Sequence, residues 1–215
     1  VDGGSAAAIR LKAGTLRLEG FSLRSQGATP VVQEGGRLEL VQGILEAGPE
    51  AALVATGGQL HLQETWFQGP GVGLRLANVP LEAMGCTFEA LGGGGIEVQE
   101  ARVGLKACTF RGCAFAGLLA GPGAEVLAEG CVFEGCSEAG VRMGTGASGQ
   151  FQQATFQNNP GFELVMAKGG SAHLQACTFA THGIAPIGLE KEAEGPELEG
   201  CEVEGVPLRE EPLRA

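Results

Sequence analysis

The chain has 215 residues, of which 44% are apolar and 38 are glycine, and its formal net charge is −11. No apolar run is long enough to span a bilayer and no basic region precedes an apolar stretch at the N-terminus, so neither a membrane span nor a signal peptide is indicated. Basic residues are scattered singly on an acidic chain, so binding to nucleic acids or to anionic membranes is not expected.

A short segment recurs along the chain, beginning with GTLRLEGFSL, GRLELVQGIL and GQLHLQETWF and continuing with copies such as VPLEAMGCTF and ARVGLKACTF. Each copy ends in an apolar residue, and these residues follow one another at intervals of 21 to 24 positions. Such a fixed period predicts a repeat architecture. The terminal residues are Leu23, Leu45, Phe67, Phe88, Phe110, Phe133, Phe156, Phe179 and Val203.

A second apolar column runs in phase with the first, and glycine-rich turns such as GPGVG and LGGGG lie between the two. Each period holds three short alternations of apolar and other residues, which indicate strands because they are too short for helices. Leucine-rich repeats share the period, but their fixed leucine framework with a helical half is missing. The second column consists of Ile9, Val31, Leu53, Leu74, Ile96, Leu118, Val141, Leu164 and Ile187, with Leu208 as a further candidate.

Over almost the whole chain, this pattern resembles the right-handed parallel β-helix repeat family, the pectate-lyase-like superfamily. The resemblance implies an all-β, right-handed, single-stranded parallel β-helix of about ten coils of 21–24 residues, with three short strands per coil. We expect the helix to span residues 1–208, followed by a C-terminal tail at 209–215. The opening residues Val1 to Gly4 resemble the register found after the first coils of such proteins, so we expect the chain to be part of a larger protein.

The family includes lyases, hydrolases, epimerases, phage spikes and adaptors without activity, so the fold alone does not give the function. Its pectin-degrading members use clusters of aspartates, for calcium or as paired acids. Asp2 is the only aspartate in this chain, so no catalytic residue carries over, and neither a metal nor another cofactor is expected.

The seven cysteines fall at repeat positions rather than in a disulfide framework or a metal-ligand cluster. We expect structural thiols of the core in a reducing compartment, and hence a cytoplasmic location. Cys113 and Cys136 are next to turns and are expected to be the more exposed ones. The remaining five share one row: Cys86, Cys108, Cys131, Cys177 and Cys201.

Glutamates on the outer face of the Leu-x-Leu segments offer a possible catalytic site. Glu39, His61 and Glu82 occupy the outward position in three successive coils. Two coils correspond to about 9.6 Å at the spacing of β-strands, which is near the roughly 6.5 to 9.5 Å between the carboxyl groups of an inverting glycosidase. A polysaccharide-active enzyme, a lyase or a glycoside hydrolase, is therefore one alternative, although this row lacks the aromatic platforms that sugar sites normally need.

Outward aliphatic residues indicate a binding surface instead. Ile44 and Trp66 lie on the Cys-Thr-Phe segments, where a row at strand pitch forms a stripe rather than a scatter. β-Branched residues also suit strands for purely structural reasons. The leading hypothesis is a non-catalytic module for protein recognition or scaffolding, which binds another protein, a neighbouring domain or a second copy. Further candidate binding residues, on the third segment of each coil, are Val32, Val54, Leu119 and Val165.

The ends of a solenoid support a third hypothesis. A parallel β-helix exposes unpaired strand edges at its ends unless they are covered. We expect either the tail from Glu190 onward or adjoining domains to cover them. Alternatively, the chain is a structural solenoid that self-associates end to end.

Overall fold

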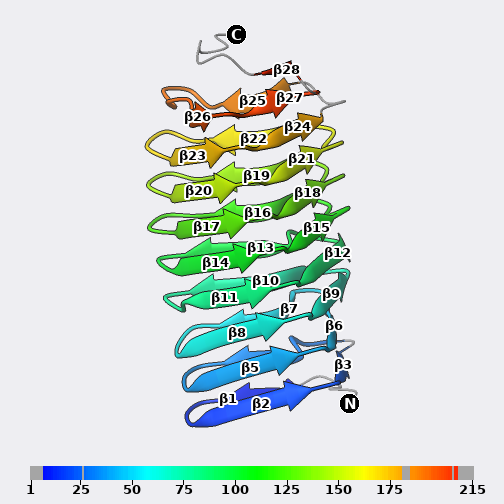
Figure 1. Cartoon of the computed structure of the whole chain (residues 1–215). Helices are drawn as coiled ribbons and strands as arrows, with labels where there is room; N and C mark the ends of the chain where they lie inside the picture. The colour runs from blue at the N-terminus through cyan, green and yellow to red at the C-terminus, as the bar shows by residue number, and fades with distance from the viewer. Residues whose placement is uncertain (1–6, 26, 181–184, 205, 208–215) are drawn as a thin grey trace.

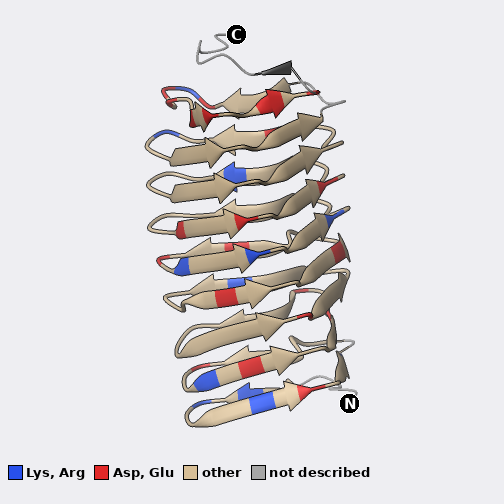
Figure 2. Ribbon diagram, viewed as in Figure 1, with Lys and Arg blue, Asp and Glu red and all other residues tan. Residues whose placement is uncertain are grey.

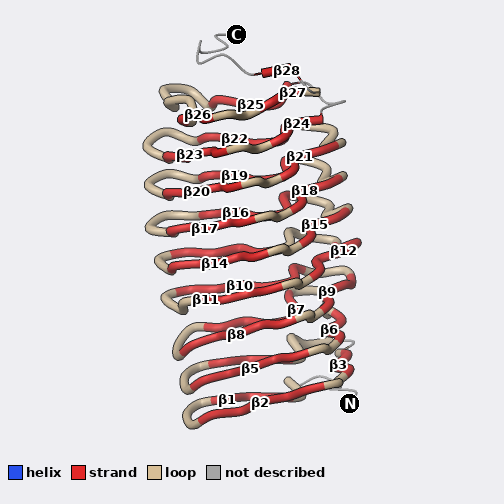
Figure 3. Tube along the Cα trace, in the orientation of Figure 1, coloured by secondary structure: helices blue, strands red, loops and turns tan. Residues whose placement is uncertain are grey.

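The three short apolar segments of each repeat form the three strands of one coil (Figure 1). The computed structural model describes residues 7–25, 27–180, 185–204 and 206–207. Over these residues the chain is a parallel β-solenoid of nine coils without a helix (Figure 3). The predicted all-β solenoid with three strands per coil is confirmed, and the prediction of about ten coils is close.

Each set of equivalent strands stacks into one long sheet. Sheet 1 contains β1 (Ile9–Leu11), β4 (Val31–Gln33), β7 (Ala51–Ala55), β10 (Val72–Ala77), β13 (Ile96–Gln99), β16 (Ala116–Ala120), β19 (Ala139–Met143), β22 (Phe162–Met166) and β25 (Ala185–Leu189). Sheet 2, built from the Leu-x-Leu segments, contains β2 (Thr15–Glu19), β5 (Arg37–Val41), β8 (Gln59–Gln63), β11 (Leu81–Met84), β14 (Arg102–Lys106), β17 (Glu125–Glu129), β20 (Ser148–Gln152), β23 (Ser171–Gln175) and β26 (Glu197–Glu199). Sheet 3, built from the Cys-Thr-Phe segments, contains β3 (Ser22–Arg24), β6 (Ile44–Glu46), β9 (Trp66–Gly69), β12 (Thr87–Leu91), β15 (Thr109–Arg111), β18 (Val132–Glu134), β21 (Thr155–Gln157), β24 (Thr178–Ala180), β27 (Glu202–Val203) and β28 (Val206–Pro207).

The strand register confirms both apolar columns. Leu23 pairs with Leu45, Leu45 with Phe67, and the pairing continues through the phenylalanines to Val203. The column that begins at Ile9 pairs in the same manner along sheet 1. Leu208, the further candidate of that column, lies outside the described residues.

The phenylalanines of sheet 3 form a continuous stack inside the solenoid. From Phe67 to Phe179, successive rings of the column have centroids 4.6 to 5.2 Å apart and planes within 14° of parallel. This separation matches the spacing between strands, so the stack follows directly from the register. Burying each ring contributes about 1.5–3 kcal/mol relative to leaving it in water.

A tight corner joins sheet 2 to sheet 3 in every coil. One residue at each corner has a left-handed backbone, with φ between 47° and 61°. Glycine adopts this conformation freely, whereas a residue with a side chain adopts it at a cost. The corner residues are Gly20, Gln42, Glu64, Gly85, Ala107, Gly130, Gln153, Ala176 and Gly200.

All seven cysteines are free and buried in the core. The pKa of the Cys86 thiol is raised, because its hydrogen bond with Cys108 and its burial both disfavour the thiolate. The prediction that Cys113 and Cys136 are more exposed was wrong, since both are completely buried. Left-handed glycines at Gly112 and Gly135 precede them, and this corner turns the following side chain inward.

Asn159 follows Cys136 in the next coil and fills the same interior corner. Its side-chain oxygen accepts a hydrogen bond from the backbone N–H of Cys136 at 2.7 Å, and its Nδ2 donates to the carbonyl of Phe133 at 3.0 Å. The Asn159 amide also contacts the carboxylate of Glu163, and both side chains are completely buried. The buried side chains of Asn159 and Glu163 are thus hydrogen-bonded in the coil that follows Cys136, where the row of cysteines begun by Cys113 ends.

The two ends of the described solenoid have less complete cores. Ile9, Leu11 and Phe21 in the first coil and Leu198 and Val203 in the last are only partly buried. At the C-terminal end, β28 pairs antiparallel with β27. The predicted tail at residues 209–215 lies outside the described residues. The described part of the chain has no helix of the length and apolarity needed to cross a membrane.

Candidate functional site

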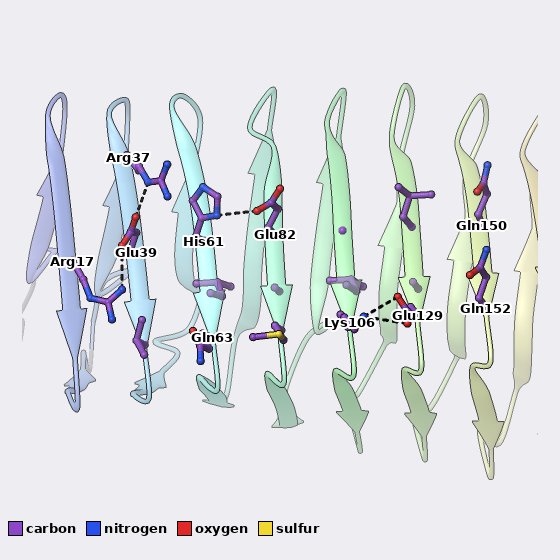
Figure 4. Close-up of a pocket in the computed structure, with 18 residues that line it drawn as sticks. Arg17, Arg37, Glu39, His61, Gln63, Glu82, Lys106, Glu129, Gln150 and Gln152 are labelled. Atoms are coloured by element: carbon purple, nitrogen blue, oxygen red, sulfur yellow. Dashed lines mark hydrogen bonds and ion pairs between the residues drawn. The ribbon is translucent and has the colours of Figure 1, made fainter.

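Sheet 2 has a shallow groove of about 740 Å³ on its outer face (Figure 4). Strand alternation creates it, because every second residue of each strand points away from the core. The groove crosses seven successive strands, from Arg17 on β2 to Gln152 on β20. Acidic and basic residues are dispersed along these strands rather than segregated by sign (Figure 2).

Glu39 lies between two arginines at one end of the groove (Figure 4). Arg37 Nε donates to Glu39 Oε1 at 2.6 Å, and Arg17 Nη1 donates to Glu39 Oε2 at 3.2 Å. These hydrogen bonds, first from Arg37 and then from Arg17, lower the pKa of Glu39 below its ordinary value. Glu39 is therefore a carboxylate at neutral pH and has no proton to donate as a general acid.

His61 lies on β8, the strand next to that of Glu39, and contacts Glu82 on the following strand, β11. His61 Nδ1 is 3.1 Å from Glu82 Oε2. The register places Glu39, His61 and Glu82 directly beside one another on β5, β8 and β11, as predicted. The three side chains nevertheless belong to two separate pairs, because Glu39 is bound by arginines and Glu82 by His61.

The sequence reasoning missed a second outward row in the same groove. It lies two residues further along each strand and includes Gln63, Met84, Lys106, Glu129 and Gln152. Lys106 Nζ contacts Glu129 Oε2 at 3.2 Å. The alternation that identified the first row also predicts this one, since outward positions recur at every second residue.

Beyond Glu82, the first outward row of the groove carries no charge as far as β20. Gly104 has no side chain there, and a Cβ at this position would meet only an ordinary contact with the carbonyl of Leu81, 3.8 Å away. Leu127 and Gln150 follow it in the same row. The residues that line the groove include no Phe, Trp or Tyr, so it lacks the aromatic platform on which a sugar ring would stack.

Ile44 and Trp66 form an exposed apolar pair on sheet 3. They are directly paired on the neighbouring strands β6 and β9, and each is 42% exposed. Their backbones are fixed by the parallel ladder, through hydrogen bonds from Ile44 N to Phe21 O and from Trp66 N to Gly43 O. The predicted exposure of these two residues is confirmed.

The other predicted binding residues lie on sheet 1 and form no continuous stripe. Val32 and Val54 are paired neighbours and are half-buried. The ion pair between Arg75 and Glu97, 2.7 Å long, separates them from Leu119 in the same row. Sheet 1 therefore offers isolated aliphatic residues between charges.

The prediction that Val165 is an exposed binding residue was wrong, because Val165 is only 5% exposed. In the next coil its partner is Gly188, over which the ring of Phe162 lies. Phe162, Arg142 and Leu189 line the same small cavity as Val165. These side chains cover Val165, and it offers little surface for a partner.

No three His, Cys, Asp or Glu residues among those described could jointly hold a metal ion. His173 repeats the arrangement of His61, with Nδ1 3.1 Å from Glu197 Oε2 in the following coil. Asp2 and His182 lie outside the described residues.

A family model described as a right handed beta helix region matches residues 94–206, which is more than half of the chain. No curated protein and no solved structure matches the chain.

Proposed function

The chain belongs to the right-handed β-helix family, and we propose that it is a non-catalytic module for protein recognition. The observation that carries the proposal is the pair formed by Ile44 and Trp66, two large apolar side chains on adjacent strands with 42% of each exposed. Large inward-facing residues such as Leu45 and Phe67 on the same strands are completely buried. Ile44 and Trp66 are therefore the apolar surface that these strands leave for a partner.

A rigid sheet suits such a role. Trp66 presents a large flat ring on a backbone that the ladder already holds in place, so little conformational entropy is lost on binding. Tryptophan is among the residues that most often dominate the energy of protein interfaces. Burial of both side chains by a partner favours association by removing apolar surface from water.

The state of Glu39 in the groove on sheet 2 argues against its use as a catalytic acid. Glu39, the most enclosed carboxylate of the groove, is held ionised by Arg37 and Arg17. General acid catalysis requires a carboxyl group that remains protonated near neutral pH, which is the opposite shift. The arrangement is that of a surface ion-pair network.

The seven free, buried cysteines support a reducing location such as the cytoplasm. Proteins that fold in oxidising compartments usually pair neighbouring cysteines as disulfides.

The test uses the sole tryptophan as its own reporter. Because the chain contains one tryptophan and no tyrosine, fluorescence excited in the tryptophan band comes from Trp66. A library of random dodecapeptides is selected on the whole chain, and retained peptides without tryptophan are titrated into it. We expect a blue shift of Trp66 emission on binding and loss of binding in Ile44→Asp. Isothermal titration measures binding to Trp66→Ser, which has no tryptophan to report. Peptides that bind Trp66→Ser and Ile44→Asp as tightly as the wild type would overturn the proposal.

A polysaccharide-active enzyme is the second candidate, favoured by the pairing of His61 with Glu82 in the groove. Its test is turnover of acidic and neutral polysaccharides by the wild type, Glu82→Gln and Glu39→Gln. Turnover that both substitutions abolish would favour the enzyme over the recognition module.

A further inference from the structure

Three glutamates lie within two residues of Ile44, of Trp66, or of Thr87, which pairs with Trp66 in the next coil. Glu46 lies two residues after Ile44 on β6, and Glu64 lies two residues before Trp66 at the corner. Glu89 follows one coil further on, on β12. The pair thus lies within an acidic setting on a chain that is itself strongly acidic.

Glu64 contributes a carboxylate that no cation neutralises through its hydrogen bonds. Gln42 Nε2 donates to its Oε2 at 2.9 Å and Gln63 Nε2 to its Oε1 at 3.3 Å. These bonds, first from Gln42 and then from Gln63, lower the pKa of Glu64. Both donors are neutral amides, so the negative charge remains available to a partner.

Glu64 occupies the left-handed corner between sheets 2 and 3, with φ 47°. Four of the nine described corners have glycine there and five have a residue with a side chain. Among those five, Glu64 is the one that carries a charge, and it lies two residues before Trp66.

The other two carboxylates are each near an arginine. Arg24 pairs with Glu46 at 2.6 Å. Arg111 is 2.9 Å from Glu134 but 3.8 Å from Glu89, so it serves two acids at once. Of the three carboxylates, Glu64 is therefore the one whose charge is left for an incoming cation.

Resting on the proposed recognition function, we infer that the partner is a protein segment that presents an arginine next to an aliphatic side chain. The arginine stacks on the indole of Trp66 and pairs with Glu64, while the aliphatic side chain packs on Ile44. A guanidinium is flat and weakly hydrated and fits both contacts, whereas an ammonium fits mainly the ion pair. The acidity around the apolar pair selects against acidic segments.

The experiment uses the dodecapeptide library on the whole chain, followed by titration of retained peptides with Trp66 emission as the signal. Each peptide is also made with arginine changed to lysine and to glutamine. The protein variants are Glu64→Gln and, as a matched control, Glu100→Gln. Glu100 is likewise exposed and left-handed, with φ 50°, but lies between β13 and β14.

We expect enrichment of arginine, and about tenfold weaker binding for Glu64→Gln and for the glutamine peptide, the size of one charge-assisted contact. The lysine peptide should be weakened as well, and Glu100→Gln should bind like the wild type. Peptides that depend on Trp66 but show no arginine enrichment, or bind Glu64→Gln unchanged, would overturn this inference and leave the recognition function standing. Equal affinity of the arginine and lysine peptides would overturn the stacking of arginine. Binding that is indifferent to both Trp66 and Ile44 would overturn the inference together with the recognition function.

Discussion

The coils before residue 94 and the coils from 94 to 206 have the same interior plan but different surfaces. Only the later coils match the family model. Along sheet 3, the early coils present Ile44 and Trp66 outward, whereas the later coils present Thr109, Val132 and Thr155 at equivalent positions. The inward column of sheet 3 stays paired through both parts, and the register of β9 with β12 shifts only after Phe88.

The comparison separates the inward residues, which build the solenoid, from the outward residues, which give this solenoid its particular surface. Inward residues are constrained by packing against the coils on either side, so they repeat. Outward residues are free of that constraint, and the early coils depart from the simple threonine pattern at neighbouring positions. The candidate binding pair and the charged end of the groove both lie in this early part.

The largest expected effect tests whether both parts share one core. Phe110→Ala removes the ring between Phe88 and Phe133 and should lower the free energy of unfolding by about 3–5 kcal/mol. Leu45→Ala, at the equivalent position of an early coil, should cost about 2–4 kcal/mol in the same transition. Urea unfolding followed by circular dichroism checks both. A separate early transition in Leu45→Ala would show that the first coils unfold on their own.

The next effect concerns the buried polar corner in the later part. Asn159→Ala removes the hydrogen bond accepted from the Cys136 N–H and the one donated to the Phe133 carbonyl, and also a contact to the buried Glu163 carboxylate. We expect a loss of about 2–3 kcal/mol in unfolding free energy. Asn158→Gly is the control, because Asn158 is exposed and has φ 56°. Thermal melts in which both variants fall equally would contradict this role of Asn159.

The sequence predicted correctly which residues point inward or outward wherever this depends only on the equivalent residues in the adjacent coils. The inward columns and outward rows were correct because a parallel solenoid places equivalent residues side by side. The prediction that Val165 is exposed was wrong because Phe162, which does not belong to the outward row of sheet 1, lies over this part of the sheet. The predicted exposure of Cys113 and Cys136 was wrong as well. It was inferred from their proximity to a turn, whereas the left-handed residue at that corner turns the next side chain inward.

The candidate site was predictable only in part. Exposure of Ile44 and Trp66 followed from alternation, and so did the adjacency of Glu39, His61 and Glu82. The involvement of Arg37 in neutralising Glu39 was not foreseen, because it depends on side-chain conformation rather than on register. Roles in binding or catalysis for any of these residues stay predictions.

A smaller effect on stability, with a large effect on binding, is expected from exchanging surface residues between the two parts. Trp66→Thr gives an early coil the residue typical of the later ones, and should lower the unfolding free energy by only about 1 kcal/mol, because the side chain is 42% exposed and loses only part of the burial energy of a large apolar residue. It should nevertheless abolish binding of the selected peptides. Thr109→Trp, made in the Trp66→Thr background, places the ring in the later part, where the corner residue is Ala107 instead of a glutamate, and should not restore binding. Isothermal titration of the single and the double variant with one peptide decides this, and binding regained by the double variant would show that the tryptophan alone suffices.

The smallest effect concerns the pH dependence that Glu39 contributes. Its pKa is lower in the folded chain than in the unfolded one, owing to Arg37 and Arg17. The associated stability is present above the ordinary glutamate pKa and is lost as pH falls through the lowered value. Glu39→Gln should therefore have a slightly lower melting temperature than the wild type near neutral pH, and the two should converge as the pH falls below the ordinary glutamate pKa and through the lowered one. The shift is small because the pairs are open to solvent, which screens them. A difference in melting temperature that stays constant over this range would mean that packing of the side chain, and not its charge, accounts for the effect, and it would remove the ion-pair argument against Glu39 as a catalytic acid.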